Sequence, residues 1–519
     1  MTVCALACAL VAAEVTAIGS AAPNVAEKFT FASVIALAEA YSKKPYEEPA
    51  PLPPALAQLD YDDWRDIRFN ADAALGRAGR WPFEIQFFHP GFLYQQTVAV
   101  QVIENGKSAP VSVARDLFDY GKNRFLAPTL PEQLGAAGFR IHGPINTKKY
   151  LDEFLVFLGA SYFRAVAAGQ RYGMSARGLA VDTASPHGEE FPWFRAFWVQ
   201  KPAPGAKDVV VYALMDSQSL TGAYSFTVRP GKETVMDVSA RIFMRKPVEK
   251  LGFAPLTSMF FYGENSLPTS PRDWRPEVHD SDGLLVRLGT GEWLWRPLQN
   301  PSTLTVSRFE ADDVMGFGLL QRDQRFGNYE DLESHYELRP SVWVEPLNNW
   351  GRGAVELYLI PTDREINDNV VAYFTPDRTP VPGEPVTLEY RMRWHTAPGA
   401  NMPPGARVVA TRTTLLNETT RLFIVEFAGT DLAKLPKDAN VVPVVSCGPG
   451  ARILEVQAYP NTETGGWRLA VQVEFKNRNT LERMLGQIDP SIELRAFLKR
   501  NADVLSETWS YAFKPERGE

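Results

Sequence analysis

The stretch RPEVHDSDGLLVRLGTGEWLWRPLQN, residues 275–300, shows most clearly how this chain folds. Its first half alternates apolar and polar residues up to Gly283, a pattern typical of a β-strand that ends in a turn. Asp280 and Asp282 stand two positions apart, so we expect their side chains on one face of that strand. Carboxylates beside a polar turn can act as a general acid or base.

Aromatic and basic residues in the same stretch allow two interpretations of these carboxylates. Trp293 and Trp295 follow in a second apolar run, and such flat side chains can stack on sugar faces. Alternatively, the carboxylates cap a turn or pair with Arg275 and Arg296, since structural ion pairs also gather acidic groups. The stretch alone leaves both interpretations open.

Length and charge define the broad class of the protein. At 519 residues the chain is too long for one typical core, so we expect two domains. Its 45% hydrophobic and 22% charged residues are ordinary for a globular protein. A net charge of -7 provides no basic surplus to neutralise phosphates, which argues against a nucleic-acid partner.

Composition indicates a strand-rich protein with sites built from loops. The chain contains 40 prolines and 37 glycines, together with 30 Phe, 18 Tyr and 12 Trp. Many turn-forming residues and many large aromatic side chains are typical of antiparallel β proteins. They also fit carbohydrate recognition, although most of the aromatics would fill a large β core in either case.

The amino terminus resembles an export signal. An apolar run that contains Cys4 and Cys8 is followed by small residues, so we predict a cleaved signal over residues 1–22. The run is too short for a stable membrane insertion. Cys447 would then be alone in the mature chain, which excludes an internal disulfide and a cysteine-based metal site. We therefore predict no metal and no cofactor.

Patterns along the chain extend the β interpretation and exclude several activities. Apolar spacing predicts a short helix over residues 28–42. Residues 191–244 repeat short strands and turns, as a large antiparallel sandwich does. Gly173 to Gly178 lacks the pattern of a phosphate-binding loop, and neither a nucleophile elbow nor a zinc-protease motif occurs.

A second carboxylate group occurs far from the first along the chain. Glu365 and Asp368 stand beside Asn367 and Asn369 in a polar segment that follows a predicted strand. Glycoside hydrolysis needs one acid and one base, and these can be delivered by different loops.

A proline-rich segment predicts how the chain divides. Residues 376–385 read as a linker. Residues 23–375 would form the large β-sandwich domain. Residues 386–519 contain about seven short strands, which is consistent with an immunoglobulin-like β-sandwich.

Taken together, the motifs resemble those of the periplasmic proteins of osmoregulated glucan biosynthesis, types G and D. The matching segments are FEIQFFHPGFLYQ, FLGASYFRAV, GQRYGMSARGLAVDT, RPEVHDSDGL, GEWLWRPL, GFGLLQRD, YELRPSVWVEP and WGRGAVEL. This resemblance implies an all-β protein with a mutarotase-like antiparallel sandwich, followed by the immunoglobulin-like sandwich. It also implies a location in the periplasm and β-1,2-glucan as the ligand.

Type D members of that family are endo-β-1,2-glucanases that invert the anomeric centre. By motif, Asp368 in EINDN resembles the general acid and Asp280 in VHDSD the general base, with Asp282 as the alternative if the register differs by one strand position. The resemblance also implies that the proton travels through ordered water and a substrate hydroxyl. Around these acids we expect a glucan cleft. Its candidate residues are Tyr262, Trp293, Trp295, Arg322, Tyr336, Trp350 and Glu365.

The resemblance leaves other functions open. About half of such aromatics prove to be core residues. A non-catalytic protein could bind or guide glucan beside the inner-membrane glucan synthase, and a transglycosylase could form cyclic or branched glucan. An epimerase would rest on fold analogy alone, and fold does not fix function. Both the hydrolase and the binding protein need an aromatic cleft, but only the hydrolase needs two carboxylates at one glycosidic bond.

Overall fold

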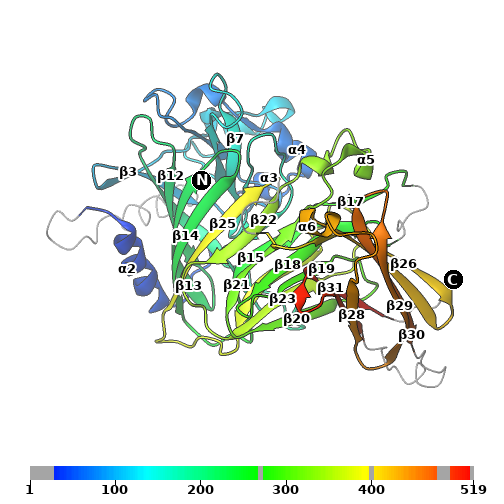
Figure 1. The fold of residues 1–519 in the computed structure, drawn as a ribbon. Helices are drawn as coiled ribbons and strands as arrows, with labels where there is room; N and C mark the ends of the chain where they lie inside the picture. Colours follow the sequence, from blue (N-terminus) through cyan, green and yellow to red (C-terminus); the bar gives the residue numbers. More distant parts are fainter. Residues whose placement is uncertain (1–27, 267–272, 397–401, 476–490, 515–519) are drawn as a thin grey trace. The chain divides into compact units, whose positions relative to one another are not determined.

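The computed structural model describes residues 28–266, 273–396, 402–475 and 491–514. These residues form antiparallel β-sheets with a few short helices (Figure 1), which confirms the all-β prediction. The predicted export signal, residues 1–22, lies outside the described residues. Within the described part, no helix is both long and apolar enough to span a bilayer.

The chain forms two compact units that do not follow simple sequence order. The first contains residues 1–256, 344–353 and 373–395, and the second contains residues 257–343, 354–372 and 396–519. The expected linker, residues 376–385, lies in the first unit between β24 (Val370–Pro376) and β25 (Val386–His395). Compactness does not test where an independently folding domain begins, so the predicted domain division remains a prediction.

The first unit is a sandwich of two sheets. One sheet runs β11-β12-β13-β14-β25, all antiparallel, and β3 joins β11 in parallel. The other runs β2-β6-β7-β8-β9. Phe157 of β7 packs against Phe197 of β11 and Phe226 of β13, with both pairs of ring centroids 5.2 Å apart. Alternating aromatic residues from both sheets thus fill one core.

The strands of these two sheets have the following bounds: β2 Glu84–Phe88, β3 Ala99–Glu104, β6 Gly138–Gly143, β7 Asp152–Leu158, β8 Tyr162–Ala165, β9 Ser175–Arg177, β11 Trp193–Gln200, β12 Val209–Asp216, β13 Leu220–Arg229 and β14 Thr234–Met244. Shorter elements accompany them: α3 Pro54–Ala57, α4 Tyr61–Asp66, β1 Arg68–Phe69, β4 Lys107–Pro110, β5 Phe118–Asp119, β10 Leu179–Val181 and β15 Leu251–Ser258.

The helix predicted over residues 28–42 is confirmed as α2, Phe31–Ser42. It lies along β12 and β13 (Figure 1). Its apolar stripe buries Val34 and Ala38 completely in a cluster with Trp198 of β11. The Thr221 hydroxyl on β13 donates a 2.7 Å hydrogen bond to the Ala38 carbonyl, so the helix is fixed by packing and by one buried polar contact.

The second unit contains the carboxylate motifs. A hairpin pairs β16 with β17, and a longer sheet runs β28-β31-β33-β19-β18-β21. A four-stranded sheet, β26-β27-β30-β29, shares its core with that longer sheet. Strand β33, near the end of the described chain, pairs in parallel with β19 and sets Trp509 opposite Trp295. The strand pattern predicted after residue 386 is seen in the described part.

The main strands of the second unit have these bounds: β16 Phe260–Tyr262, β17 Val278–His279, β18 Gly283–Leu288, β19 Trp293–Pro297, β20 Thr305–Ala311, β21 Val314–Leu320, β23 Gly353–Leu359, β26 Arg407–Asn417, β27 Thr420–Ala428, β28 Val442–Cys447, β29 Ala451–Asn461, β30 Gly466–Phe475, β31 Ile492–Arg500 and β33 Thr508–Phe513. Strand β22, Ser341–Pro346, leads from this unit into the first. A short helix, α5 (Phe326–Tyr329), follows β21.

The aromatic core of the first unit should control its stability. We expect Phe157→Ala to lower the free energy of unfolding by about 3–5 kcal/mol, because the ring is 1% exposed and its loss leaves a cavity. Urea denaturation measures the change. Phe125→Ala is the matched control: this ring is 70% exposed, and its loss should cost at most about 0.5 kcal/mol. Equal losses in the two variants would contradict this assignment of the core.

Candidate functional site

Asp280 lies where the β16–β17 hairpin turns toward β18. Phe260 of β16 pairs with His279 of β17, and the backbone N–H of Asp280 donates a 2.8 Å hydrogen bond to the Met259 carbonyl. Below the turn, the hydroxyls of Ser258 and Ser281 lie 2.8 Å apart. The predicted strand therefore ends at His279, and the backbone of Asp280 is fixed against residue 259.

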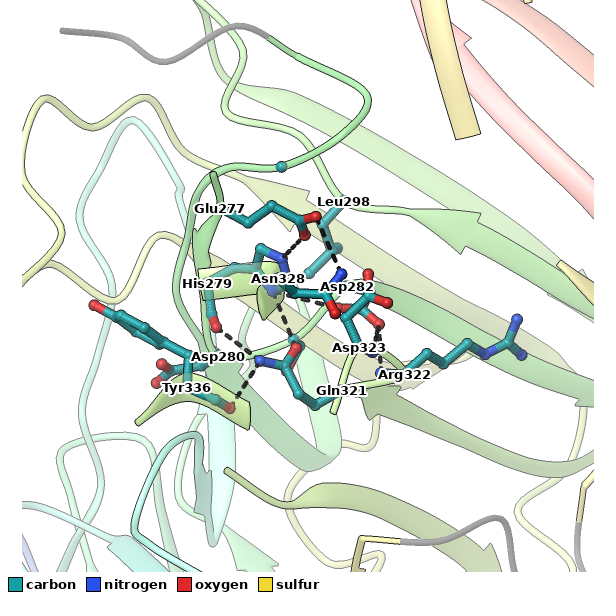
Figure 2. Close-up of polar contacts among 12 residues, drawn as sticks. Glu277, His279, Asp280, Asp282, Leu298, Gln321, Arg322, Asp323, Asn328 and Tyr336 are labelled. Carbon is teal, nitrogen blue, oxygen red and sulfur yellow. Dashed lines mark hydrogen bonds and ion pairs between the residues drawn. The ribbon is translucent and has the colours of Figure 1, made fainter. Parts of the chain in front are cut away.

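The Asp280 carboxylate is buried and forms an ion pair with Arg339. The Arg339 guanidinium lies over the Tyr336 ring, 4.1 Å from its centroid, and Figure 2 shows Asp280 beside Tyr336. Arginine keeps its proton at any physiological pH, so the pair holds a charged carboxylate in one position. Sequence reasoning did not select Arg339, although it stands in the quoted motif YELRPSVW.

Asp282 faces different partners from Asp280, so the expectation that the two share one face is not met. Its carboxylate accepts hydrogen bonds from the backbone N–H groups of Arg322 and Asp323, the second at 2.9 Å. Figure 2 shows Asp282 beside these residues, while Asp280 lies beside Tyr336. The chain leaves extended geometry after His279, so the two-residue alternation no longer applies. Asp282 closes a turn.

A buried imidazole holds the turn together. His279 Nε2 lies 2.9 Å from Glu277 Oε2, and Nδ1 lies 3.0 Å from Gln321 Oε1. The Gln321 amide nitrogen donates to the carbonyls of His279 and Tyr336, so its oxygen is free to accept from the imidazole. Burial lowers the pKa of His279, but the Glu277 hydrogen bond and the Asp282 charge outweigh it and raise the pKa to about 9. His279 is thus a cation with both N–H groups bonded.

Carboxylates surround this cation. Burial, with the charges of Glu277 and Asp323, raises the pKa of Glu264 to about 7. Burial and the Glu277 charge raise the pKa of Asp323 to about 6. Ligand oxygens of Glu264, Glu277 and Asp323 lie within 4.8 Å of one another, a spacing that a hard cation could occupy. The spacing alone assigns no ion to this group.

The second predicted carboxylate group lies on an exposed turn that is tied to the same hairpin. Asn369 Oδ1 accepts a 2.8 Å hydrogen bond from the Phe260 N–H, and its Nδ2 donates to the Phe260 carbonyl at 3.0 Å. Asn369 is 1% exposed, whereas its neighbour Asp368 is exposed. A buried amide thus fastens the Asp368 turn to β16, the strand that pairs with β17, which Asp280 follows.

Glu365, on the same turn, forms an ion pair with Arg275 at 2.6 Å. Arg275 also pairs with Asp273 at 2.8 Å and Asp331 at 3.0 Å, and its carbonyl accepts from the Tyr262 hydroxyl at 3.2 Å. The Arg275 hydrogen bond lowers the pKa of Asp273 to about 2. One arginine therefore connects three acidic segments, and Tyr262 is anchored beside it.

Tyr336 lies beside Asp280 (Figure 2), under the Arg339 guanidinium. Burial is the main reason that its pKa rises to about 12, while Arg339 lowers it and the charges of Glu365 and Asp280 raise it. It keeps its proton at neutral pH and remains a hydrogen-bond donor.

Five predicted cleft aromatics are buried, Tyr262 and Tyr336 among them at 0% and 2% exposure, and Arg322 is bonded within the protein. The Arg322 guanidinium bonds to Glu507 at 2.6 and 3.0 Å and lies 3.5 Å from the centroid of Trp295. Trp293 stacks on Trp343, with centroids 5.6 Å apart. In the first unit, Trp350 packs edge-on against Phe253 and Tyr390 and at a tilt against Phe374. We do not propose Arg322, Trp293, Trp295 or Trp350 as glucan contacts.

Comparison with known proteins places the chain in a family. Residues 29–513 match the family described as periplasmic glucan biosynthesis protein, MdoG. The chain belongs to this family. The family confirms the predicted resemblance, the periplasmic location and a part in glucan biosynthesis.

Two relatives and one solved structure illustrate the extent of similarity. Glucans biosynthesis protein G of Ralstonia nicotianae is 47% identical over 506 residues, which cover 95% of this chain and 98% of that protein. Glucans biosynthesis protein G of Rhodopseudomonas palustris is 45% identical over 492 residues, 94% of each chain. The solved structure of a polysaccharide lyase aligns with 66% of this chain and with 39% of the lyase chain, at 10% sequence identity. Its TM-score of 0.16 is too low to indicate a shared fold.

The buried acids predict a pH dependence of stability. Burial raises the pKa of Glu264 from an ordinary value of 4.5 to about 7, so between these pH values the folded protein keeps a proton that the unfolded chain loses. The folded state therefore loses stability as pH rises through that window. We expect Glu264→Gln to gain on the order of 3 kcal/mol relative to wild type between about pH 4.5 and pH 8.

Urea unfolding at the two pH values tests this, with Glu463→Gln as the control because Glu463 is exposed in a turn. A stability difference between Glu264→Gln and wild type that stays constant with pH would show that Glu264 holds no extra proton in the folded state.

Proposed function

We propose that the protein is an inverting endo-β-1,2-glucanase that acts on the backbone of the periplasmic glucan, with Asp368 as general acid and Asp280 as general base. The observation that carries the proposal is a double connection to residues 259–260, where β16 begins. The Asp280 backbone is bonded to Met259, and Asn369, the neighbour of Asp368, is bonded to Phe260. Two segments far apart in sequence, each with one acid, thus attach to adjacent residues.

The surroundings of the two acids suit different roles. Asp280 is buried beside a permanent cation, Arg339, as a base that must stay ionised requires. Asp368 is exposed in the free protein. A glucan chain lying across it would exclude water and favour its protonated form, which a general acid needs. Bound substrate would thereby keep Asp368 protonated, as a general acid must be.

Tyr336 and Arg339 support a path between the acids. The Tyr336 ring lies under the Arg339 guanidinium, which forms the ion pair with Asp280. Glu365 stands three residues from Asp368, and its ion pair with Arg275 holds that end of the turn. A protonated phenol here could orient a substrate hydroxyl or a water molecule that passes a proton toward Asp280. Arg339 would then balance the charge when the base is ionised.

The substitution Asp368→Asn tests the acid. We expect it to reduce the rate at which purified protein shortens linear β-1,2-glucan by about 100-fold or more, because an amide cannot protonate the leaving oxygen. Binding of the same glucan should persist. Size-exclusion chromatography of the products measures the rate, and Asp363→Asn is the control, since Asp363 is exposed on the same turn.

The result also separates hydrolysis from the alternatives. If wild-type protein binds the polymer but never changes its length distribution, the protein handles glucan without cleaving it, for instance beside the inner-membrane glucan synthase. If cyclic or branched products form without net hydrolysis, the same acids serve a transglycosylase.

The stereochemistry of the product tests the role of Asp280. A base that activates water on the face opposite the leaving group inverts the anomeric centre, so the first reducing ends formed from β-linked glucan should be α anomers. Proton NMR during the first turnovers distinguishes the anomers before they equilibrate. Initial β anomers would instead require a covalent intermediate and would remove Asp280 from the role of base.

A further inference from the structure

The first unit contains a concave pocket that shares no residue with the Asp280 and Asp368 group. Its volume is about 720 Å³, which is within the range of small-molecule binding sites, about 300–1,000 Å³. Helix α4 and strand β1 form one side, and β2, β6 and β7 form the floor. Every lining residue belongs to the first unit.

The floor of the pocket is a row of polar side chains on neighbouring strands. Gln86 of β2 pairs with Arg140 of β6, and His142 of β6 pairs with Glu153 of β7. Arg140 and His142 are two residues apart on one strand, so their side chains emerge on the same face. Arg140 is held by a 3.0 Å ion pair with Glu153 and lies over the Phe88 ring.

Two buried atoms in this row have no hydrogen-bond partner among the described residues: Arg140 Nε and His142 Nε2. Burial lowers the pKa of His142, so its ring is neutral at neutral pH. Its Nδ1 lies 3.2 Å from the Leu151 carbonyl, which can only accept, so Nδ1 carries the proton and Nε2 is a bare acceptor.

Both atoms lie below the pocket surface, so a ligand would meet the partly exposed remainder of the Arg140 and His142 side chains. A hydroxyl group both donates and accepts, so a polyhydroxylated ligand would suit such a polar floor.

Aromatic side chains stand at the same pocket. The Trp64 indole is fixed by a 2.8 Å hydrogen bond from Nε1 to the His89 carbonyl and by Tyr94, 4.8 Å away between centroids. Tyr150 lines the pocket and is 66% exposed. Rigid aromatic surfaces beside polar groups suit the C–H faces and hydroxyl edges of pyranose rings.

Charge favours a neutral ligand. Three arginines line the pocket, Arg65, Arg68 and Arg140, against two acids, Asp152 and Glu153. Such a near balance does not provide the basic surplus that a phosphate-rich polymer would need. Within the described residues, only the Arg140–Glu153 pair is already engaged as an ion pair across the floor.

We propose that this pocket is a second saccharide-binding site that holds a glucose-based segment of the periplasmic glucan. It rests on the substrate named above but not on its cleavage. A glucan bound at both sites would be retained by two contacts, so long chains would bind more tightly than short ones. The site would thereby select polymer over fragments.

Hydrogen–deuterium exchange on Asp368→Asn protein saturated with linear β-1,2-glucan tests the site directly. We expect slower exchange in peptides that cover residues 64–69 and 146–152 as well as in those that cover residues 277–282. Protection at 277–282 alone would overturn the second site and leave the proposed function intact. Protection at the pocket alone would support the second site and count against the proposed active site. Protection at neither segment would overturn both.

A pair of exposed aromatic residues provides the matched variants. Tyr150→Ala should weaken binding of long glucan by about tenfold, because it removes an aromatic surface from the pocket. The variant should remain folded, since the Tyr150 ring is exposed. Phe125→Ala is the control, since its ring is 70% exposed in the same unit but does not line the pocket. Isothermal titration of both variants in the Asp368→Asn background measures the change. Equal affinities for the two variants would overturn the proposed role of the pocket.

Discussion

The buried His279 cation is the interaction on which the site depends. A charged imidazole in a protein interior is costly unless both N–H groups are bonded and its charge is balanced. Here Glu277 and Gln321 accept the two hydrogen bonds, and the Asp282 carboxyl lies 3.3 Å from Nδ1 of the ring. Removing one partner would leave the others uncompensated, so the turn between β17 and β18 has one stable arrangement. Asp280 occupies its position because that turn is fixed.

Strand β16 also fixes the backbone beside the second acid, Asp368. It is only three residues long, yet one edge pairs with β17 and its backbone is also clamped by the Asn369 amide. The buried Asn369 side-chain amide accepts one hydrogen bond from the Phe260 backbone and donates another to it, as the backbone of a neighbouring strand would. The exposed turn that carries Asp368 is therefore held by a buried contact, so Asp368 is exposed while the backbone beside it is fixed.

The aromatic residues show why composition is an ambiguous guide to ligand binding. Trp293, Trp295 and Trp350 have the chemistry of sugar platforms, but all three are at least nine-tenths buried in cores. Burying a large ring contributes more to stability than leaving it exposed in a cleft. The same residue type can serve either purpose, and only the neighbours distinguish them. Tyr150 and Trp64, which line a pocket, did not stand out in the sequence.

The sequence by itself determined the all-β class, the α2 helix, the family and the two carboxylate motifs, because these depend on local periodicity and on residue order. Tertiary structure alone decided what the motifs face. Arg339 reaches Asp280 from 59 positions away, and Asn369 reaches Phe260 from 109 positions away. Contacts over such separations follow from strand pairing and core packing, and a pattern of neighbouring residues does not encode them. Asp280 and Asp282 are adjacent in a motif yet have different partners for the same reason.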